Sequence, residues 1–147
     1  MLSRQIIVSI MFGLFLSLSV HSQAVCNNAP TLGPVIRAYY DALKKKDDAA
    51  VSRVLSTRFL AILKKDMKDE GKKHIAAFLA EVDYRKDMQP IDVKDEVLVG
   101  DNGAALVKGS FYKSWTPIGF VKENGTWRLS GENPDEKLML RLPRQLN

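Results

Sequence analysis

Residues 119–130 read GFVKENGTWRLS and contain an Asn-Gly pair between two alternating apolar stretches. Both central residues of a two-residue hairpin loop need a positive φ, which Asn124 and Gly125 tolerate best. This loop length fixes the register, so that Phe120 faces Leu129 on the opposite strand. The pattern therefore predicts an antiparallel hairpin. We expect its inward side to hold Ile118, Phe120, Trp127 and Leu129.

The sequence ahead of this hairpin also alternates as strands do. After Pro90, apolar residues are separated by acids and a lysine, which indicates a strand that runs to about Val99. Residues 100–103 are typical of a turn, and residues 104–115 predict a long second strand. Its inward side is expected to hold Ala105, Val107, Phe111 and Trp115. Gly109 falls on the same side, which favours a bulge or a bend there.

The first half of the chain has helical spacing instead. Thr31 is a candidate cap for a helix with Pro34 in its first turn. Its apolar face comprises Val35, Ile36, Tyr39 and Leu43. Asp47 and Asp48 offer a cap for a second helix that carries Val51, Val54 and Leu55. A third apolar stripe, made of Ile75, Phe78, Leu79 and Val82, predicts another helix.

Two further segments complete the pattern. Residues 57–65 fit either a helical turn or a short buried strand, and periodicity does not decide between them. Asn133 and Pro134 resemble a helix start, so we expect a short tail helix over residues 134–142. Helices followed by antiparallel strands predict an α+β fold in a single domain.

Two stretches carry a family resemblance. Residues 35–59, VIRAYYDALKKKDDAAVSRVLSTRF, resemble the opening helices of nuclear transport factor 2-like domains, and GFVKENGTWRLS resembles their final hairpin. This superfamily includes the SnoaL-like and ketosteroid isomerase-like proteins and has the cystatin-like fold. The resemblance covers residues 34–130. It implies N-terminal helices packed in a cone against a curved antiparallel sheet, with a pocket between the first helix and the concave face.

The N-terminus has the pattern of a secretory signal peptide. Arg4 precedes an apolar stretch over residues 6–20, which is shorter than the roughly 20 residues needed to cross a bilayer. Small residues at Ser22 and Ala24 predict cleavage after Ala24. We therefore expect a signal over residues 1–24, an N-terminal segment over 25–33 and one domain over 34–142, secreted or periplasmic, with no transmembrane segment after cleavage.

Cys26 offers a second interpretation of the same region, in which it becomes the lipidated first residue of a bacterial lipoprotein. Gln23 and Val25 disfavour this, because such signals have an aliphatic residue three positions before the cysteine and a small one directly before it. With one cysteine in the chain, no internal disulfide is available, so the fold must be held by packing.

The chain carries a formal net charge of +5, and its basic residues are interleaved with acids. Solvated helix faces explain this distribution better than nucleic-acid binding does. The stretch from Lys44 to Lys73 still leaves open an interaction module that meets an anionic surface.

The resemblance implies Tyr, Asp or His side chains inside the cone when a member is an enzyme, as in ketosteroid isomerase, scytalone dehydratase and polyketide cyclases. Of the pair Tyr39 and Tyr40, helical spacing turns Tyr39 inward, as core or pocket wall. Asp66, Asp69 and His74 fall in stretches that we expect to be exposed, and one histidine without clustered partners makes no metal site. We assign no catalytic residue, metal or cofactor.

Aromatic residues on the predicted inward face either line a hydrophobic cavity or fill it. The predicted lining comprises Tyr39, Phe59, Phe78, Phe111, Trp115 and Trp127. We expect an exported domain that binds a small apolar ligand or a partner protein without catalysis, with a homodimer through the outer sheet face as one arrangement. The alternative is an isomerase, dehydratase or cyclase that uses Tyr39 and a pocket carboxylate such as Asp83.

Overall fold

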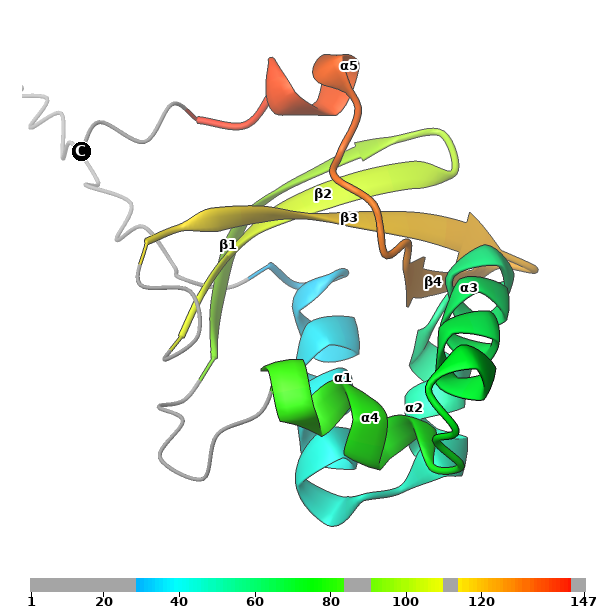
Figure 1. Cartoon of the computed structure of the whole chain (residues 1–147). Coiled ribbons are helices and arrows are strands. Elements are labelled where there is room, and N and C mark those ends of the chain that lie inside the picture. Colours follow the sequence, from blue (N-terminus) through cyan, green and yellow to red (C-terminus); the bar gives the residue numbers. More distant parts are fainter. Residues whose placement is uncertain (1–28, 84–90, 110–113, 144–147) are drawn as a thin grey trace, which may run out of the picture.

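The computed structural model describes residues 29–83, 91–109 and 114–143. The described chain is an α+β domain with five helices and one four-stranded antiparallel sheet (Figure 1). Its elements are α1 (Gly33–Lys45), α2 (Asp48–Val54), α3 (Thr57–Asp69), α4 (Ile75–Asp83), β1 (Asp92–Val99), β2 (Asn102–Lys108), β3 (Thr116–Glu123), β4 (Thr126–Leu129) and α5 (Glu136–Met139). The predicted signal over 1–24, Cys26 and Phe111 lie outside the described residues.

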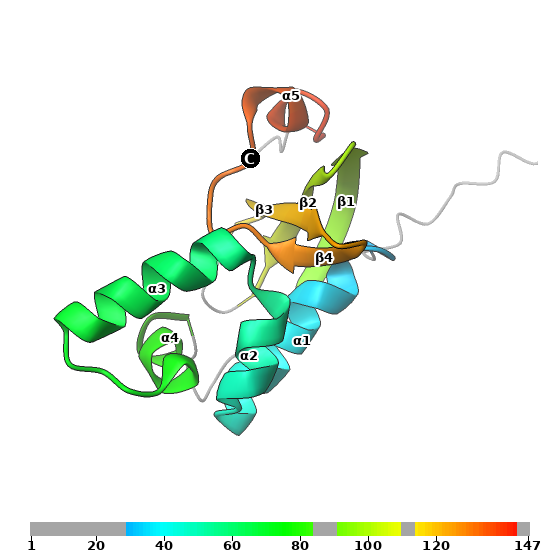
Figure 2. The same cartoon turned by 90° about the vertical axis from the view of Figure 1, so that its right-hand side faces the viewer.

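The strands lie in the order β1-β2-β3-β4, each next to its neighbour in the sequence. Helices α1 to α4 lie on one side of the sheet and α5 lies on the other, as two perpendicular views show (Figures 1 and 2). We call these sides the inner face and the outer face. Every helix in the described ranges is too short or too polar to span a bilayer.

The predicted hairpin is confirmed as β3 and β4, with Phe120 opposite Leu129. Asn124 and Gly125 form its turn, with φ values of 50° and 78°. The positive φ at both positions explains why the sequence has Asn-Gly there.

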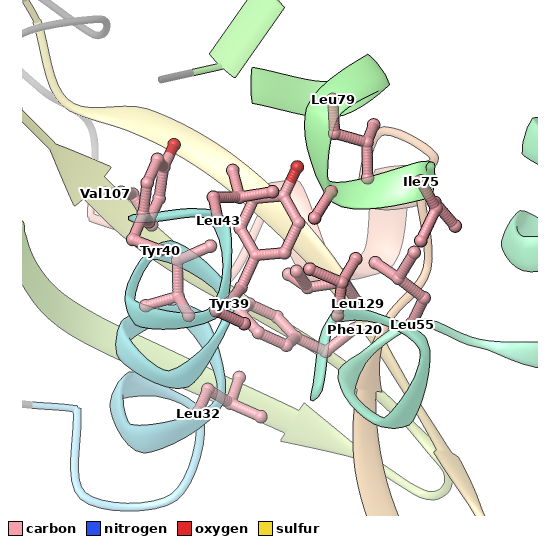
Figure 3. Packing of buried hydrophobic residues seen from close by; sticks show 14 of the residues in the cluster. Leu32, Tyr39, Tyr40, Leu43, Leu55, Ile75, Leu79, Val107, Phe120 and Leu129 are labelled. Atoms are coloured by element: carbon pink, nitrogen blue, oxygen red, sulfur yellow. The ribbon is translucent and has the colours of Figure 1, made fainter. Parts of the chain in front are cut away.

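The main hydrophobic core lies between the inner face and the helices. Phe120 is 2 % exposed and lies at its centre, with Leu43 from α1 and Leu55 from the end of α2 nearby (Figure 3). Ile118 and Trp127 pack against the same cluster. The inward side predicted for the hairpin is therefore confirmed.

A second, smaller core lies on the outer face. Its buried members are Ala104 and Leu106 of β2 with Leu138 and Leu142 of the C-terminal segment. Alternation along β2 explains the division, because Ala105 and Val107 point to the main core instead. The short helix α5 thus covers part of the face on which we considered dimer pairing.

The prediction of a long second strand is wrong in three respects. Strand β2 ends at Lys108, and the chain bends at Gly109. Trp115 comes just before β3 and packs on the outer core, where Lys94 Nζ lies 4.2 Å from the centre of its ring. The turn before β2 is also shorter than predicted, because Val99 already faces Asn102.

The bend expected at Gly109 is present, and a separate irregularity lies in β1. The register between β1 and β2 shifts between Lys94 and Val97, and Asp95 there has a φ of 52°. A bulge inserts a residue into one strand and redirects the side chains that follow it. Here the next residue, Glu96, reaches the start of α1.

Glu96 replaces the predicted cap of the first helix. The Thr31 side chain makes no capping bond; Leu32 is the residue before the helix. The backbone N–H groups of Thr31 and Leu32 donate to a Glu96 carboxylate oxygen, at 3.0 and 2.8 Å. A carboxylate at this position satisfies N–H groups that have no partner within the helix and favours the positive end of its dipole.

The other helix starts follow local capping rules. Asp47 caps α2 by accepting a hydrogen bond from Ala50 N at 2.8 Å, as predicted. The undecided segment 57–65 is helical and belongs to α3, because Ser56 accepts from Phe59 N at 3.1 Å. The tail helix predicted over residues 134–142 is confirmed only as the shorter α5, Glu136–Met139, with Asp135 rather than Asn133 as its cap.

Candidate functional site

A cleft of about 500 Å³ opens between α1 and the inner face of β3. This volume is in the usual range for small-molecule sites. Its lining comprises Ile36, Tyr39, Tyr40, Phe59, Pro117, Ile118, Gly119, Leu129, Gly131, Glu132 and Asn133.

The cleft exists because β4 is short. Strand β4 pairs with residues 120–123 of β3 and leaves the start of β3 without a strand on that side. Residues 130–134, which we call the strap, occupy this place and lead from β4 to α5. Ser130 N donates to the Gly119 carbonyl at 3.0 Å, and the strap then crosses β3.

Gly119 allows this crossing. A Cβ at this position would lie 2.5 Å from the Glu132 carbonyl oxygen and 2.7 Å from Ser130 Oγ. Real Cβ atoms do not approach other atoms so closely, so any larger residue would push the strap away from β3.

The helix side of the cleft is aromatic. Tyr39 and Tyr40 project side by side from α1 (Figure 3), with ring centroids 5.2 Å apart in an edge-to-face arrangement. Both are buried and both line the cleft. Tyr39 therefore turns inward as expected, but the expectation that only one of the two tyrosines does so is wrong. Neighbouring residues on a helix point about 100° apart. Because α1 is covered by both the sheet and other helices, its buried face is broad enough to include both tyrosines.

Phe59 closes the opposite side. Its ring lies against the backbone of Gly131, where a Cβ would overlap the ring atoms. Gly131 also has a φ of 72°, which favours glycine. The start of α3 and the strap are therefore packed together at the mouth of the cleft.

One ion pair spans this mouth. Arg58 Nη2 lies 2.8 Å from Glu132 Oε1, and the two side chains are 75 % and 48 % exposed. We call it the rim ion pair. Among the described residues of the lining, Glu132 is the one carboxylic acid, and Arg58 is its partner.

The predicted lining residues lie in different places. Tyr39 and Phe59 line the cleft, whereas Phe78 of α4 packs on the main core away from the lining. Trp127 also packs on the main core, at the far end of the sheet beside Gly103. Trp115 lies on the outer face, and Phe111 is not among the described residues.

Candidate catalytic side chains do not converge on Tyr39 within the described residues. Asp66 and Asp69 are exposed on α3, and the Asp83 side chain lies outside what the structure describes. His74 is exposed, with Nδ1 3.0 Å from Asp48 Oδ2. No three metal-binding side chains form a group in the described ranges.

Asp48 has a structural role, because its Oδ1 accepts a hydrogen bond from Ala76 N at 2.9 Å in the first turn of α4. This hydrogen bond is the main reason why the pKa of Asp48 lies below its ordinary value of 3.8. Burial opposes it in part, and the weaker hydrogen bond to His74 lowers the pKa further.

Comparison with known proteins gave no match to any family model, curated protein or solved structure.

Sequence reasoning missed the strap side of the cleft, namely Gly131, Glu132 and Asn133. These residues are typical of a surface loop, and their position depends on where β4 ends and on which way the chain crosses β3. The two glycines at 119 and 131 were the available signal, because close backbone approaches often need glycine.

Proposed function

We propose that this domain binds a small apolar ligand in the cleft between α1 and β3, as an exported nuclear transport factor 2-like protein without catalysis of its own. The observation that carries the proposal is the cleft itself, about 500 Å³ in volume with walls of tyrosine, phenylalanine and aliphatic side chains. Clefts of this size and lining are the usual form of small-molecule sites.

The position of the cleft supports the family proposal. Four helices precede a sheet that they cover on one face, and the cleft lies between the first of these helices and that face. The resemblance of residues 35–59 and 119–130 implies a pocket in this place. Export after cleavage at Ala24 remains part of the proposal and has its own test, which is mass spectrometry of the N-terminus of the secreted protein.

The edge of β3 favours a small molecule over an added peptide strand. A peptide that extended the sheet would need backbone donors along residues 116–119. Pro117 has no N–H, and the Gly119 carbonyl already accepts from Ser130. Strand addition at the cleft is therefore disfavoured.

The cleft is also a weak catalytic site. Proton transfer needs a base or acid within hydrogen-bonding reach of the substrate, preferably with a shifted pKa. The lining supplies Glu132, which is half exposed and paired with Arg58. This arrangement supports binding over the isomerase, dehydratase or cyclase alternative.

A fluorescence titration with 1-aminoanthracene, an uncharged aromatic probe, tests the proposal. Ile118 points into the cleft from β3, so Ile118→Trp should fill it and abolish saturable binding. Leu98→Trp is the matched control, because Leu98 is 41 % exposed on the same face and does not line the cleft. If the wild-type protein shows no saturable binding, or if both variants bind alike, the ligand proposal fails.

A further inference from the structure

The lining of the cleft contains both apolar and polar side chains. Ile36, Ile118 and Leu129 are aliphatic, whereas the polar groups come from the two tyrosines of α1 and from Glu132 and Asn133 of the strap. Among the described residues of the lining, Glu132 is the one acidic or basic side chain. The charged groups that a ligand meets are therefore Glu132 and its partner Arg58, at the mouth of the cleft.

At the mouth, the charge of Glu132 is balanced. Arg58 approaches it from the first turn of α3, next to Phe59, while Glu132 belongs to the strap on the other side. The rim ion pair thus places one cation and one anion beside the entrance, each as the partner of the other. A charged group on a ligand would have to displace one of them, or enter the cleft without a counter-ion.

We infer that the cleft selects uncharged ligands because the opposite charges of Arg58 and Glu132 balance each other at its mouth. The inference rests on the proposed ligand-binding function and adds the charge class of the ligand. A fatty acid or another carboxylate would compete with Glu132 for Arg58, and an amine would compete with Arg58 for Glu132. An uncharged molecule leaves the pair intact.

The selection also predicts how it can be changed. Glu132→Gln leaves Arg58 without its partner, so the mouth becomes positive and should accept an anion. Arg58→Gln leaves Glu132 without its partner, so the mouth becomes negative and should accept a cation. Both residues are well exposed, so either change should leave the fold intact.

Three probes with one aromatic core test this. They are 1-aminoanthracene, which is uncharged at pH 7, anthracene-1-carboxylate and 1-(aminomethyl)anthracene, which is a cation. The wild-type protein should bind the uncharged probe most tightly. Glu132→Gln should strengthen carboxylate binding about two- to fivefold, and Arg58→Gln should strengthen binding of the cation by a similar factor, as expected for exposed charge pairs.

The two variants control for each other, because both break the rim ion pair. If loss of the pair merely loosens the strap, both variants will shift all three probes in the same direction, and the inference is overturned. The double variant, with glutamine at both positions, should restore the wild-type order of affinities. Thermal unfolding of each variant checks that the fold is retained.

Failure of the inference is separable from failure of the proposed function. If the wild-type protein binds the carboxylate as tightly as the uncharged probe, and Ile118→Trp abolishes both, the cleft binds ligands but does not select by charge. If no probe binds the wild-type protein in a saturable manner, both the function and the inference are wrong.

Discussion

The two faces of the sheet are covered in different ways. Four helices cover the inner face and bury a large core centred on Phe120, whereas a four-residue helix and the turn after it cover the outer face. The cleft lies at the border between these regions, where the strap passes from one face to the other. This difference indicates that the inner core supplies the stability of the fold, while the outer cover and the strap are held by a few contacts.

The largest expected effect tests the inner core. Phe120→Ala removes a ring that is 2 % exposed, and the cavity left behind should cost about 3–5 kcal/mol of unfolding free energy. Urea unfolding followed by circular dichroism measures this cost. A loss below about 1 kcal/mol would contradict the assignment of stability to the inner face.

The next effect tests the outer cover. Leu138→Ala removes the buried side chain that holds α5 on β2, and we expect a loss of about 2–3 kcal/mol. Because α5 has few other contacts, part of this loss should appear as local opening. Hydrogen exchange should therefore quicken at Leu138 to Leu142 more than in α1.

Met139→Ala is the matched control for this variant, since Met139 is the next residue and is exposed. It should change neither stability nor exchange appreciably. If exchange quickens equally in α1 and α5, the two faces unfold as one unit. This result would contradict the proposed difference in stability between the inner core and the outer cover.

A third variant tests the strap that joins the faces. Gly131→Ala combines a positive φ with overlap against the Phe59 ring and should cost about 2 kcal/mol. Gly125→Ala is the control, because Gly125 also has a positive φ but no atom lies within 4 Å of a Cβ built there. We expect Gly131→Ala to cost about 1 kcal/mol more than the control. Equal unfolding midpoints would show that the contact with Phe59 adds nothing.

The smallest expected effect concerns the helical layer over the inner face. Asp48 joins α2 to the first turn of α4, so Asp48→Ala should cost about 1 kcal/mol at pH 7, as loss of a helix cap does. The folded protein holds the pKa of Asp48 below its ordinary value. Its contribution is therefore fully present above pH 4–5 and is lost as the pH falls through the lower pKa of the folded state.

Urea midpoints of the wild-type protein and Asp48→Ala between pH 7 and pH 3 measure this contribution. The difference between the two proteins should shrink on acidification. A difference that stays constant over this range would mean that the carboxylate charge does not stabilise α4.

The sequence predicted those parts of the fold that depend on neighbouring residues. The register of the β3–β4 hairpin follows from Asn124 and Gly125, and the Asp47 cap of α2 lies three residues from its donor. Helical spacing placed Tyr39 on the inward side of α1, whereas periodicity left the segment that contains Phe59 undecided between helix and strand.

The remainder depended on contacts between distant residues. Glu96 caps a helix that starts more than sixty residues earlier, and no local pattern around Thr31 reveals it. The prediction placed Trp115 on the inner face by assuming that β2 continues in regular alternation to residue 115. Strand β2 ends at Lys108, so this assumption fails. The strap side of the cleft was missed for the same reason, because Glu132 reaches Arg58 only after the whole sheet has formed.

The Glu96 contact also has a consequence for the order of folding. A chain that emerges N-terminus first holds the start of α1 with unsatisfied backbone donors until β1 has been synthesised. The N-terminus of α1 therefore receives its cap from β1, which follows all four N-terminal helices in the sequence. Because this contact joins residues 64 positions apart, the cap of α1 forms only once a chain of at least that length is available.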